Sequence, residues 1–212
     1  MKGEYDVVII GGGPIGSIAS LLLEAKGLSV ALIERNTVPY PFPRAIALNG
    51  FSMGLVKDLI GPELWSEFEF TPGIHVGYVL NKDKMDEPFG LMQPPVIEGK
   101  ILDNDSFGFL NWFNQPQLEG LLRRSIEDRD GITTLYGHEA LVLWEDDLNF
   151  VRVQELSTGE SFDISGKYLL GADGGGSFVR KQMGADLKSL GKSIHFLLSL
   201  IHISEPTRPS TI

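Results

Sequence analysis

A glycine-rich turn near the N-terminus lies between two apolar segments, and this pattern constrains the fold more than any other. Residues 5–10 are β-branched and almost wholly apolar, as expected for a strand buried on both faces of a parallel sheet. Three glycines follow at the spacing Gly11-x-Gly13-x-x-Gly16, and a helical segment separates them from a second apolar stretch at 28–33. The order strand, turn, helix, strand predicts a βαβ unit.

This unit is suited to hold a dinucleotide. Gly11 and Gly13 allow a tight turn whose backbone N–H groups can approach a pyrophosphate, and Gly16 allows the helix to pack closely on the strand. The helix, expected over residues 15–26, directs its positive N-terminal end at the phosphates. Glu34 follows the second strand, at the position from which a carboxylate binds a ribose 2′-hydroxyl. Glycine turns alone are common, so the prediction rests on all these features together.

Composition restricts the class of protein. The 212 residues are enough for one or two domains with a substantial core. The formal net charge is −10 and no basic stripe is present, so we expect no nucleic-acid partner. We expect no membrane partner and no signal peptide, because no apolar run has the ~20 residues of a membrane span and the first strand starts almost at once. Cysteine is absent, which excludes thiolate metal sites and disulfides, and we expect a cytoplasmic protein without a metal.

The first half of the chain continues with mixed patterns. A stiff, proline-rich connector at 39–43 precedes a short helix that Asn49 can cap, and residues 62–68 are expected to form another helical turn. Alternating apolar residues predict a hairpin over 74–92. Residues 93–106 are rich in turn formers and are expected to form a loop.

The second half has one strong helix and several strands. The helix begins at Pro116, because proline is favourable in the first helical turn. Strands are then expected at 131–135, 141–144, 150–156, 161–164 and 168–173. Short turns join the three strands between 141 and 164, which predicts a small antiparallel meander. Ser177 can cap a helix after the last strand. The fold class is therefore α/β: a Rossmann-like domain with a parallel sheet, a βαβ unit and a meander.

The last fifteen residues, 198–212, do not continue the preceding pattern. The stretch from Leu198 to Arg208 is similar to the translation of a transposase-type sequencing adapter, and Pro206 and Pro209 break any helix or central strand. We expect residues 198–212 to be a non-native adapter read-through and the natural protein to continue beyond residue 197. A poorly ordered natural tail is the alternative.

Four spaced motifs occur in an order that is typical of one enzyme family. They are the glycine motif with Glu34-Arg35, Arg44-Ala45, Gln115-Pro116-x-Leu118-Glu119, and Gly171-Ala172-Asp173-Gly174-x-x-Ser177-x-Val179-Arg180. With them the chain resembles the single-component FAD-dependent aromatic hydroxylases, a group similar to para-hydroxybenzoate hydroxylase. The Gln-Pro-x-Leu-Glu form looks closest to the branch of phenol and 3-(3-hydroxyphenyl)propionate hydroxylases. Four motifs together are far more specific than one.

The resemblance implies an FAD site. Its expected cofactor-binding residues are Gly11, Gly12, Gly13, Pro14, Ile15, Gly16, Glu34, Arg35, Arg44, Gln115, Asp173 and Gly174. The glycine turn would cradle the pyrophosphate, Glu34 would hold the adenosine ribose, and Arg35 would flank the adenine. Arg44 would face a phosphate and Gln115 would reach the ribityl chain. Asp173-Gly174 would form a second loop for FAD and for the transient visit of NAD(P)H. The structural alternatives are a solvated charge for Arg44, a helix cap for Gln115 and a turn residue for Asp173.

The resemblance also implies a domain division. An FAD-binding domain would span residues 1–183, with 70–106 contributing to a substrate domain whose sheet starts at 184–197. The family's third motif, a downstream Gly-Asp before a helix, is missing from this sequence. We therefore expect an N-terminal fragment that is inactive by itself.

For the complete protein the resemblance implies a monooxygenase. NAD(P)H would reduce the flavin, O₂ would form a flavin C4a-hydroperoxide, and one oxygen atom would pass to a small phenolic or other aromatic substrate. No catalytic residue is assigned, because His75, His138 and His195 are isolated in the sequence. Alternatives are another FAD-dependent oxidoreductase (an epoxidase, halogenase or reductase), an NAD-dependent dehydrogenase, or a non-catalytic flavin-binding remnant.

Overall fold

The computed structural model describes residues 3–42, 44–72, 77–81, 84–92, 96–97, 100–101 and 110–188. Its helices are α1 (Pro14–Glu24), α2 (Gly50–Glu67), α3 (Gln115–Glu127) and α4 (Phe178–Gln182). Its strands are β1 (Glu4–Ile10), β2 (Val30–Glu34), β3 (Ala47–Asn49), β4 (Phe70–Pro72), β5 (Gly77–Asn81), β6 (Lys84–Met92), β7 (Val96–Ile97), β8 (Lys100–Ile101), β9 (Leu110–Phe113), β10 (Ile132–Tyr136), β11 (His138–Glu145), β12 (Asn149–Glu155) and β13 (Ser161–Gly171).

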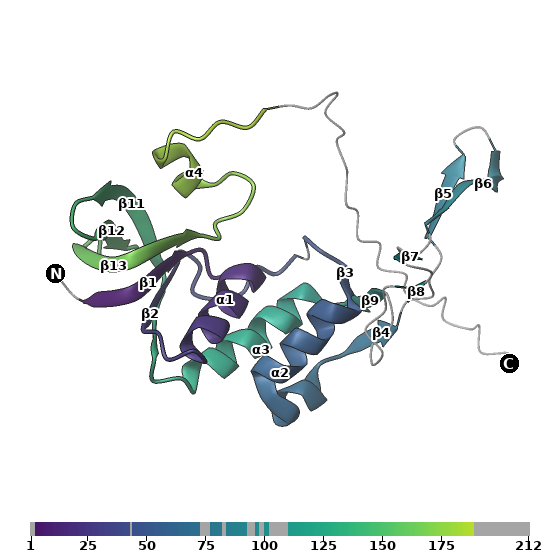
Figure 1. Ribbon diagram of the computed structural model, residues 1–212, viewed down its shortest axis with the longest axis horizontal. Coiled ribbons are helices and arrows are strands. Elements are labelled where there is room, and N and C mark those ends of the chain that lie inside the picture. The colour runs from purple at the N-terminus through teal and green to yellow at the C-terminus, as the bar shows by residue number, and fades with distance from the viewer. Residues whose placement is uncertain are drawn as a thin grey trace, which may run out of the picture.

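The main sheet joins a parallel half to an antiparallel half in the order β10-β2-β1-β13-β12-β11. The strands β10, β2, β1 and β13 are parallel, and β11 and β12 form an antiparallel meander with β13. This confirms the expected α/β fold class, the βαβ unit and the meander. The helices α1, α2 and α3 lie together on one side of the parallel half (Figure 1).

The strand β13 replaces two strands that were expected from the sequence. Residues 161–164 and 168–173 were expected to be separate strands, and the structure corrects this, because β13 runs unbroken over Ser161–Gly171. Its first part pairs with β12 and its second part with β1. Gly166 lies where both pairings meet, and a Cβ there would come within 2.9 Å of Val8 Cγ2. This glycine therefore permits a close approach of two strands and does not mark a turn.

The core has two layers, one on each face of the parallel strands. Val7 and Ile9 face the layer formed with α1, α2 and α3, whereas Val8 and Ile10 face the layer formed with the meander and α4. Successive side chains of a strand point to opposite faces, so both sets of side chains are buried. The apolar character of residues 5–10 is explained by this burial on both faces.

Local signals set the ends of the helices. The side chain of Asn49 accepts a hydrogen bond from the backbone N–H of Ser52 at 2.8 Å and so caps α2, as expected. Gly61, with a φ of 77°, and Pro62 interrupt α2, so that the turn expected at 62–68 is its second, kinked part. Ser177 caps α4 as expected, because its hydroxyl accepts from the N–H of Arg180 at 3.0 Å.

A second, three-stranded sheet has the order β3-β9-β4 and was not expected from the sequence. Each of its strands has three or four residues, too short for an alternating pattern to be recognised. The hairpin expected over 74–92 is confirmed in β5 and β6. The short strands β7 and β8 pair within the stretch 93–106, which corrects its interpretation as a loop.

Some expectations fall on parts of the chain that the structure does not describe. Residues 184–188 follow α4 without regular structure, and residues 189–212, which include most of the expected first substrate-domain strand and the adapter-like stretch, lie outside the described residues. In the part of the chain that is described, no helix is both long and apolar enough to cross a membrane.

Candidate functional site

Three neighbouring parallel strands end at the same edge of the sheet and bring the predicted site residues together. In register, Ile10 of β1 lies beside Ile33 of β2 and Gly171 of β13. The Gly11 N–H donates to the carbonyl oxygen of Ile33 at 2.8 Å, and the Ala172 N–H donates to that of Ile10 at 2.7 Å. The carboxyl ends of parallel strands beside a change in strand order form a crevice that commonly binds ligands. Here that crevice lies on either side of β1.

The glycines of the turn have different structural roles. Gly11 has a φ of 105°, a backbone conformation that residues with a side chain rarely adopt, and a Cβ there would lie 2.5 Å from the carbonyl oxygen of Ala172. A Cβ on Gly16 would lie 1.8 Å from the carbonyl oxygen of Gly11, so that α1 packs directly on the turn. A Cβ on Gly13 would meet no atom within 4 Å, because this residue borders open space. Gly11 and Gly16 are therefore required by packing, whereas Gly13 leaves room for a ligand.

Glu34 is held in one orientation by the backbone around it. Its Oε2 accepts from the N–H of Gly12 at 2.8 Å. Its Oε1 accepts from the backbone N–H of Asn36 at 2.8 Å and from Asn36 Nδ2 at 2.6 Å. Each carboxylate oxygen has two lone pairs, so Oε2 keeps capacity to accept from a hydroxyl in the cleft.

Asp173 organises the second loop. Its Oδ1 accepts from the Ser177 hydroxyl at 2.6 Å, and its Oδ2 accepts from the N–H groups of Phe178 at 2.6 Å and Val179 at 3.0 Å. Burial alone would raise the pKa of Asp173, but the hydrogen bonds from Ser177 and from the backbone outweigh it and hold the pKa below its usual value. Asp173 thus stays ionised and ties the start of α4 to the end of β13.

Gln115 and Arg44 meet across the fold. The Oε1 atom of Gln115 accepts from the backbone N–H groups of Arg44 at 2.8 Å and Ala45 at 2.7 Å. Its Nε2 donates to Glu119 Oε1 at 2.7 Å, and Gln115 and Glu119 are both buried. The guanidinium of Arg44 stacks on the ring of Tyr40, 4.7 Å from its centroid. The amide of Gln115 therefore fastens the chain at Arg44 to the first turn of α3.

These loops surround a cleft of ≈ 560 Å³. Ten of the expected residues line it: Gly11, Gly12, Gly13, Pro14, Ile15, Glu34, Arg35, Arg44, Asp173 and Gly174. Gly16 and Gln115 do not line the cleft. Gly16 packs against the backbone of Gly11, and Gln115 contacts the backbone N–H of Arg44. The structure thus gathers the residues of separate motifs into one space.

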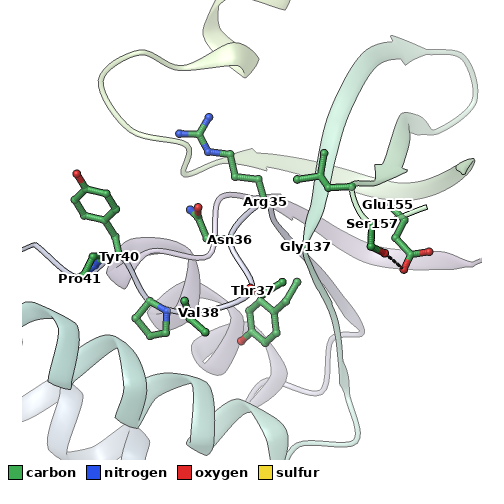
Figure 2. Close-up of a pocket in the computed structure, with 12 residues that line it drawn as sticks. Arg35, Asn36, Thr37, Val38, Tyr40, Pro41, Gly137, Glu155 and Ser157 are labelled. Atoms are coloured by element: carbon green, nitrogen blue, oxygen red, sulfur yellow. Dashed lines mark hydrogen bonds between the residues drawn. The ribbon is translucent and has the colours of Figure 1, made fainter. Parts of the chain in front are cut away.

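A second hollow of ≈ 410 Å³ continues from the cleft and shares Arg35, Asn36 and Tyr40 with it. Figure 2 shows it between the segment that follows β2 and the strand ends near Gly137 and Glu155. In this view Arg35 and Tyr40 extend away from the helix below them. Arg35 therefore lies between the two hollows.

Sequence reasoning missed several residues that line the cleft. They are Asn36, Tyr40, Arg123, His138, Glu139, Ala140 and Phe178, along with Ile10 and Ile33. Glu119 and Ala172, which also line it, stand in two of the quoted motifs, and Gly175 and Gly176 belong to the glycine loop that was expected to approach the cofactor. One signal was available, because Gln115, Glu119 and Arg123 recur every fourth residue and therefore follow one another along a face of α3. All three are buried, which marks this polar stripe as part of a site or of a structural network. His138 has no comparable signal, since its position depends on the pairing of β11 and β12.

The cleft fits a dinucleotide cofactor. A Cβ added to Gly13, Gly174, Gly175 or Gly176 would meet no atom within 4 Å, so the backbone of both loops is open to a ligand. The N–H groups in the first turn of a helix have no intrahelical acceptor, and α1, which starts with a proline, has no side-chain cap to accept from them. Such N–H groups suit a pyrophosphate. Together the fold and the cleft define a Rossmann-type dinucleotide-binding domain.

Comparison with known families identifies this domain further. The chain matches the FAD binding domain family over residues 4–211 and belongs to that family. Among curated proteins it is 30% identical over 188 residues to a 3-(3-hydroxy-phenyl)propionate/3-hydroxycinnamic acid hydroxylase of Burkholderia vietnamiensis, with 85% of this chain and 28% of that protein covered. It is also 30% identical to a probable NADH-specific resorcinol 4-hydroxylase of Rhodococcus jostii, with 90% of this chain and 34% of that protein covered. The chain thus spans about a third of the length of these relatives.

Solved structures give the same class of fold. The flavin-dependent monooxygenase PieE, solved in complex with FAD and substrate, superposes with a TM-score of 0.67 at 26% identity, over 85% of this chain and 32% of PieE. The p-nitrophenol 4-monooxygenase PnpA of Pseudomonas putida superposes with a TM-score of 0.68 at 18% identity, over 87% of this chain and 44% of PnpA. The expected resemblance to FAD-dependent aromatic hydroxylases is confirmed.

Proposed function

We propose that this chain is the FAD-binding part of a monooxygenase that hydroxylates a small phenolic substrate with NAD(P)H and O₂. The main support is that the glycine turn, Glu34 and the Asp173 loop meet in one cleft at the edge of the parallel strands. The named relatives act on phenolic or hydroxyphenyl compounds, and one of them is described as NADH-specific. A cytoplasmic location, where NAD(P)H is available, belongs to the same proposal.

Different residues of the cleft would bind different parts of the cofactor. The backbone from Gly11 to Ile15 and the start of α1 would bind the pyrophosphate. Glu34, whose Oε2 keeps acceptor capacity, would bind the adenosine ribose, and Arg35 would lie beside the adenine. Arg44, held by its stacking on a tyrosine ring, would offer a cation to a phosphate. Gln115 would act mainly through Arg44, because its Oε1 already accepts two backbone N–H groups.

Bound FAD would accept a hydride from NAD(P)H and would then activate O₂. The protein's contribution in this chain is binding and orientation. The ionised Asp173 fixes the loop Gly174–Gly176, whose open backbone permits a close approach to the cofactor. The carboxylate of Glu34 disfavours a ribose 2′-phosphate, since two anions would meet in a half-buried site. FAD rather than NADP is therefore the expected resident.

The cofactor assignment can be tested by titration of the purified chain. The fluorescence of FAD should be quenched when it binds, which gives its affinity. Calorimetry gives the affinity of NADP, which should bind more weakly than FAD. Glu34→Gln removes the charge but keeps the shape, so it should weaken FAD and reduce the discrimination against NADP. Preferential binding of NADP, with no flavin bound, would refute the assignment.

The reaction is tested on the product of the complete gene. NADH and NADPH are each supplied with phenol, resorcinol and 3-(3-hydroxyphenyl)propionate, and products are analysed by mass spectrometry under ¹⁸O₂. Incorporation of one ¹⁸O atom into the ring is the expected result. FAD binding with reductant oxidation but no labelled product from any phenolic compound would favour another class of FAD-dependent oxidoreductase.

A further inference from the structure

We propose that Arg123 is a positioning residue for the adenosine half of the cofactor. It lies on α3, outside the four motifs, and holds the turn after β2 so that the Glu34 carboxylate faces the cleft. This inference rests on the proposed function, because the role is defined toward FAD.

Arg123 is a buried cation whose contacts are directed at the turn. Only 7% of its surface is exposed, and its guanidinium carbon lies 4.3 Å from the centroid of the Tyr136 ring. Nη1 donates to the carbonyl oxygen of Thr37 at 2.8 Å, and Nη2 donates to that of Asn36 at 3.4 Å. Figure 2 shows the segment with Asn36 and Thr37 running alongside the helix below it. The guanidinium therefore binds two successive backbone carbonyls while it stacks on a strand residue.

Asn36 connects this contact to the carboxylate. Its carbonyl oxygen accepts from Arg123, while its backbone N–H and its Nδ2 both donate to Glu34 Oε1. Glu34 Oε2 in turn accepts from the N–H of Gly12. A continuous set of hydrogen bonds thus runs from α3 through the turn to the glycine motif. A shift of the turn would rotate Glu34 away from the cleft or break its bond to Gly12.

A separate observation places Arg123 at the wall of the cleft. Its Nε is buried and has no hydrogen-bond partner within the described residues, and Arg123 lines the cleft. An unpaired buried donor on a charged group is costly, so this cation is tolerated there for its other contacts, which are the two carbonyl oxygens of the turn.

The chemistry of the contact requires a guanidinium. Its planar fork can bind two carbonyl oxygens and stack on an aromatic ring at the same time, whereas an ammonium has no such plane. Arg123→Lys should therefore keep the charge and the aliphatic stem but hold the turn less firmly. Arg123→Met should lose all three interactions.

The first test is ADP binding, because ADP represents the adenosine half of FAD. Arg123→Met should weaken ADP by about tenfold or more, the loss expected for charge-assisted hydrogen bonds, and Arg123→Lys should weaken it less. The matched control is Arg124→Met, because Arg124 is the next residue on α3, is exposed and pairs with Glu67 on the surface. This control should bind ADP like the wild type in isothermal titration.

The second test needs no ligand. In amide hydrogen exchange, Arg123→Lys should speed exchange at Gly12 and Asn36, whose N–H groups donate to Glu34, and leave the amides of β1 and β13 unchanged. A merely structural role would instead lower the protection of the whole domain. If Arg123→Met does not fold, the lysine variant carries both comparisons.

The outcomes separate this inference from the proposed function. Wild-type ADP affinity in Arg123→Met, or unchanged exchange at Asn36, would refute the positioning role and leave the FAD assignment intact. Failure of the complete gene's product to bind FAD or ADP would refute the proposed function, and with it the role of Arg123 toward the cofactor.

Discussion

The glycine turn allows a sharp prediction, because two of its glycines should respond oppositely to the same added methyl group. In Gly16→Ala the new Cβ would lie 1.8 Å from the carbonyl oxygen of Gly11 and 3.4 Å from the Cβ of Ala172. In Gly13→Ala the new Cβ would meet nothing within 4 Å. Gly16→Ala should therefore damage the fold, and Gly13→Ala should damage only ligand binding.

The magnitude for Gly16→Ala follows from what obstructs the methyl group. The obstacle is backbone, and the Gly11 N–H is itself bonded to Ile33 at 2.8 Å, so the turn cannot simply swing away. Added methyl groups in packed regions cost about 1–3 kcal/mol, and a backbone obstacle places this variant near about 3 kcal/mol. For a domain of this size, each kcal/mol lowers Tm by about 2–4 °C, so a decrease of about 6–12 °C is expected.

For Gly13→Ala two small effects oppose each other. Gly13 has φ −71° and ψ −173°, which alanine adopts without strain, and fewer unfolded conformations favour alanine by about 0.4–1 kcal/mol. Gly13 is also the N-cap of α1, where alanine is less favourable than glycine by a similar amount. The stability of the apoprotein should thus change by less than about 1 kcal/mol. FAD affinity should fall, because the methyl group lies on the wall of the cleft.

Thermal unfolding of both apoproteins and FAD titration of both variants check this prediction. Equal destabilisation by the two substitutions would show that the space beside Gly13 is not open. Wild-type stability in Gly16→Ala would show that α1 does not rest on the turn. Either result refutes the reasoning.

Three further predictions concern polar side chains. Asp6→Asn should destabilise the chain at neutral pH but not at strongly acidic pH. The hydrogen bonds from Lys167 and from Ser29 hold the pKa of Asp6 well below its usual range, so the stability that the ionised carboxylate provides is lost as pH falls through that lowered pKa. Urea unfolding measured across pH checks this prediction. Asp173→Ala should lose about 1 kcal/mol as a helix cap and weaken FAD by more than this loss explains, as comparison of urea unfolding with FAD titration shows. Gln115→Leu should cost about 1–3 kcal/mol in unfolding free energy, because it leaves the buried Glu119 carboxylate without its donor and the Arg44 N–H without its acceptor.

The sequence predicts well those features whose causes are local. The βαβ unit lies within about 30 residues, as such units do, and its glycine spacing, its apolar strands and Glu34 all indicate the same arrangement. The caps at Asn49 and Ser177 are confirmed, because each depends on a backbone N–H three residues away. Parallel strand ends meet at one edge, so the convergence of separate motifs could also be expected.

Features that depend on distant pairing were not predicted. The sheet β3-β9-β4 pairs β9 with segments about 60 and about 40 residues earlier in the chain, through three or four residues each, and no periodicity exists over so short a stretch. The continuity of β13 was missed because Gly166 resembles a strand break, whereas it permits the approach of Val8. The role of Arg123 depends on a ring of β10 and on carbonyls of the turn after β2, which only the folded structure brings together.

The helix α3 contributes to the wall of the cleft beyond the motif in its first turn. Gln115 and Arg123 are two helical turns apart, about 12 Å along the helix axis, and they bind opposite ends of the segment 36–45. At one end the Gln115 oxygen accepts N–H groups, starting with that of Arg44; at the other end the Arg123 guanidinium donates to carbonyls, including that of Asn36. Because one anchor offers an acceptor and the other offers donors, the two ends cannot exchange places. The polar stripe of α3 therefore fixes both the position and the direction of the segment, and the cleft inherits its shape from a helix that the glycine motif does not contain.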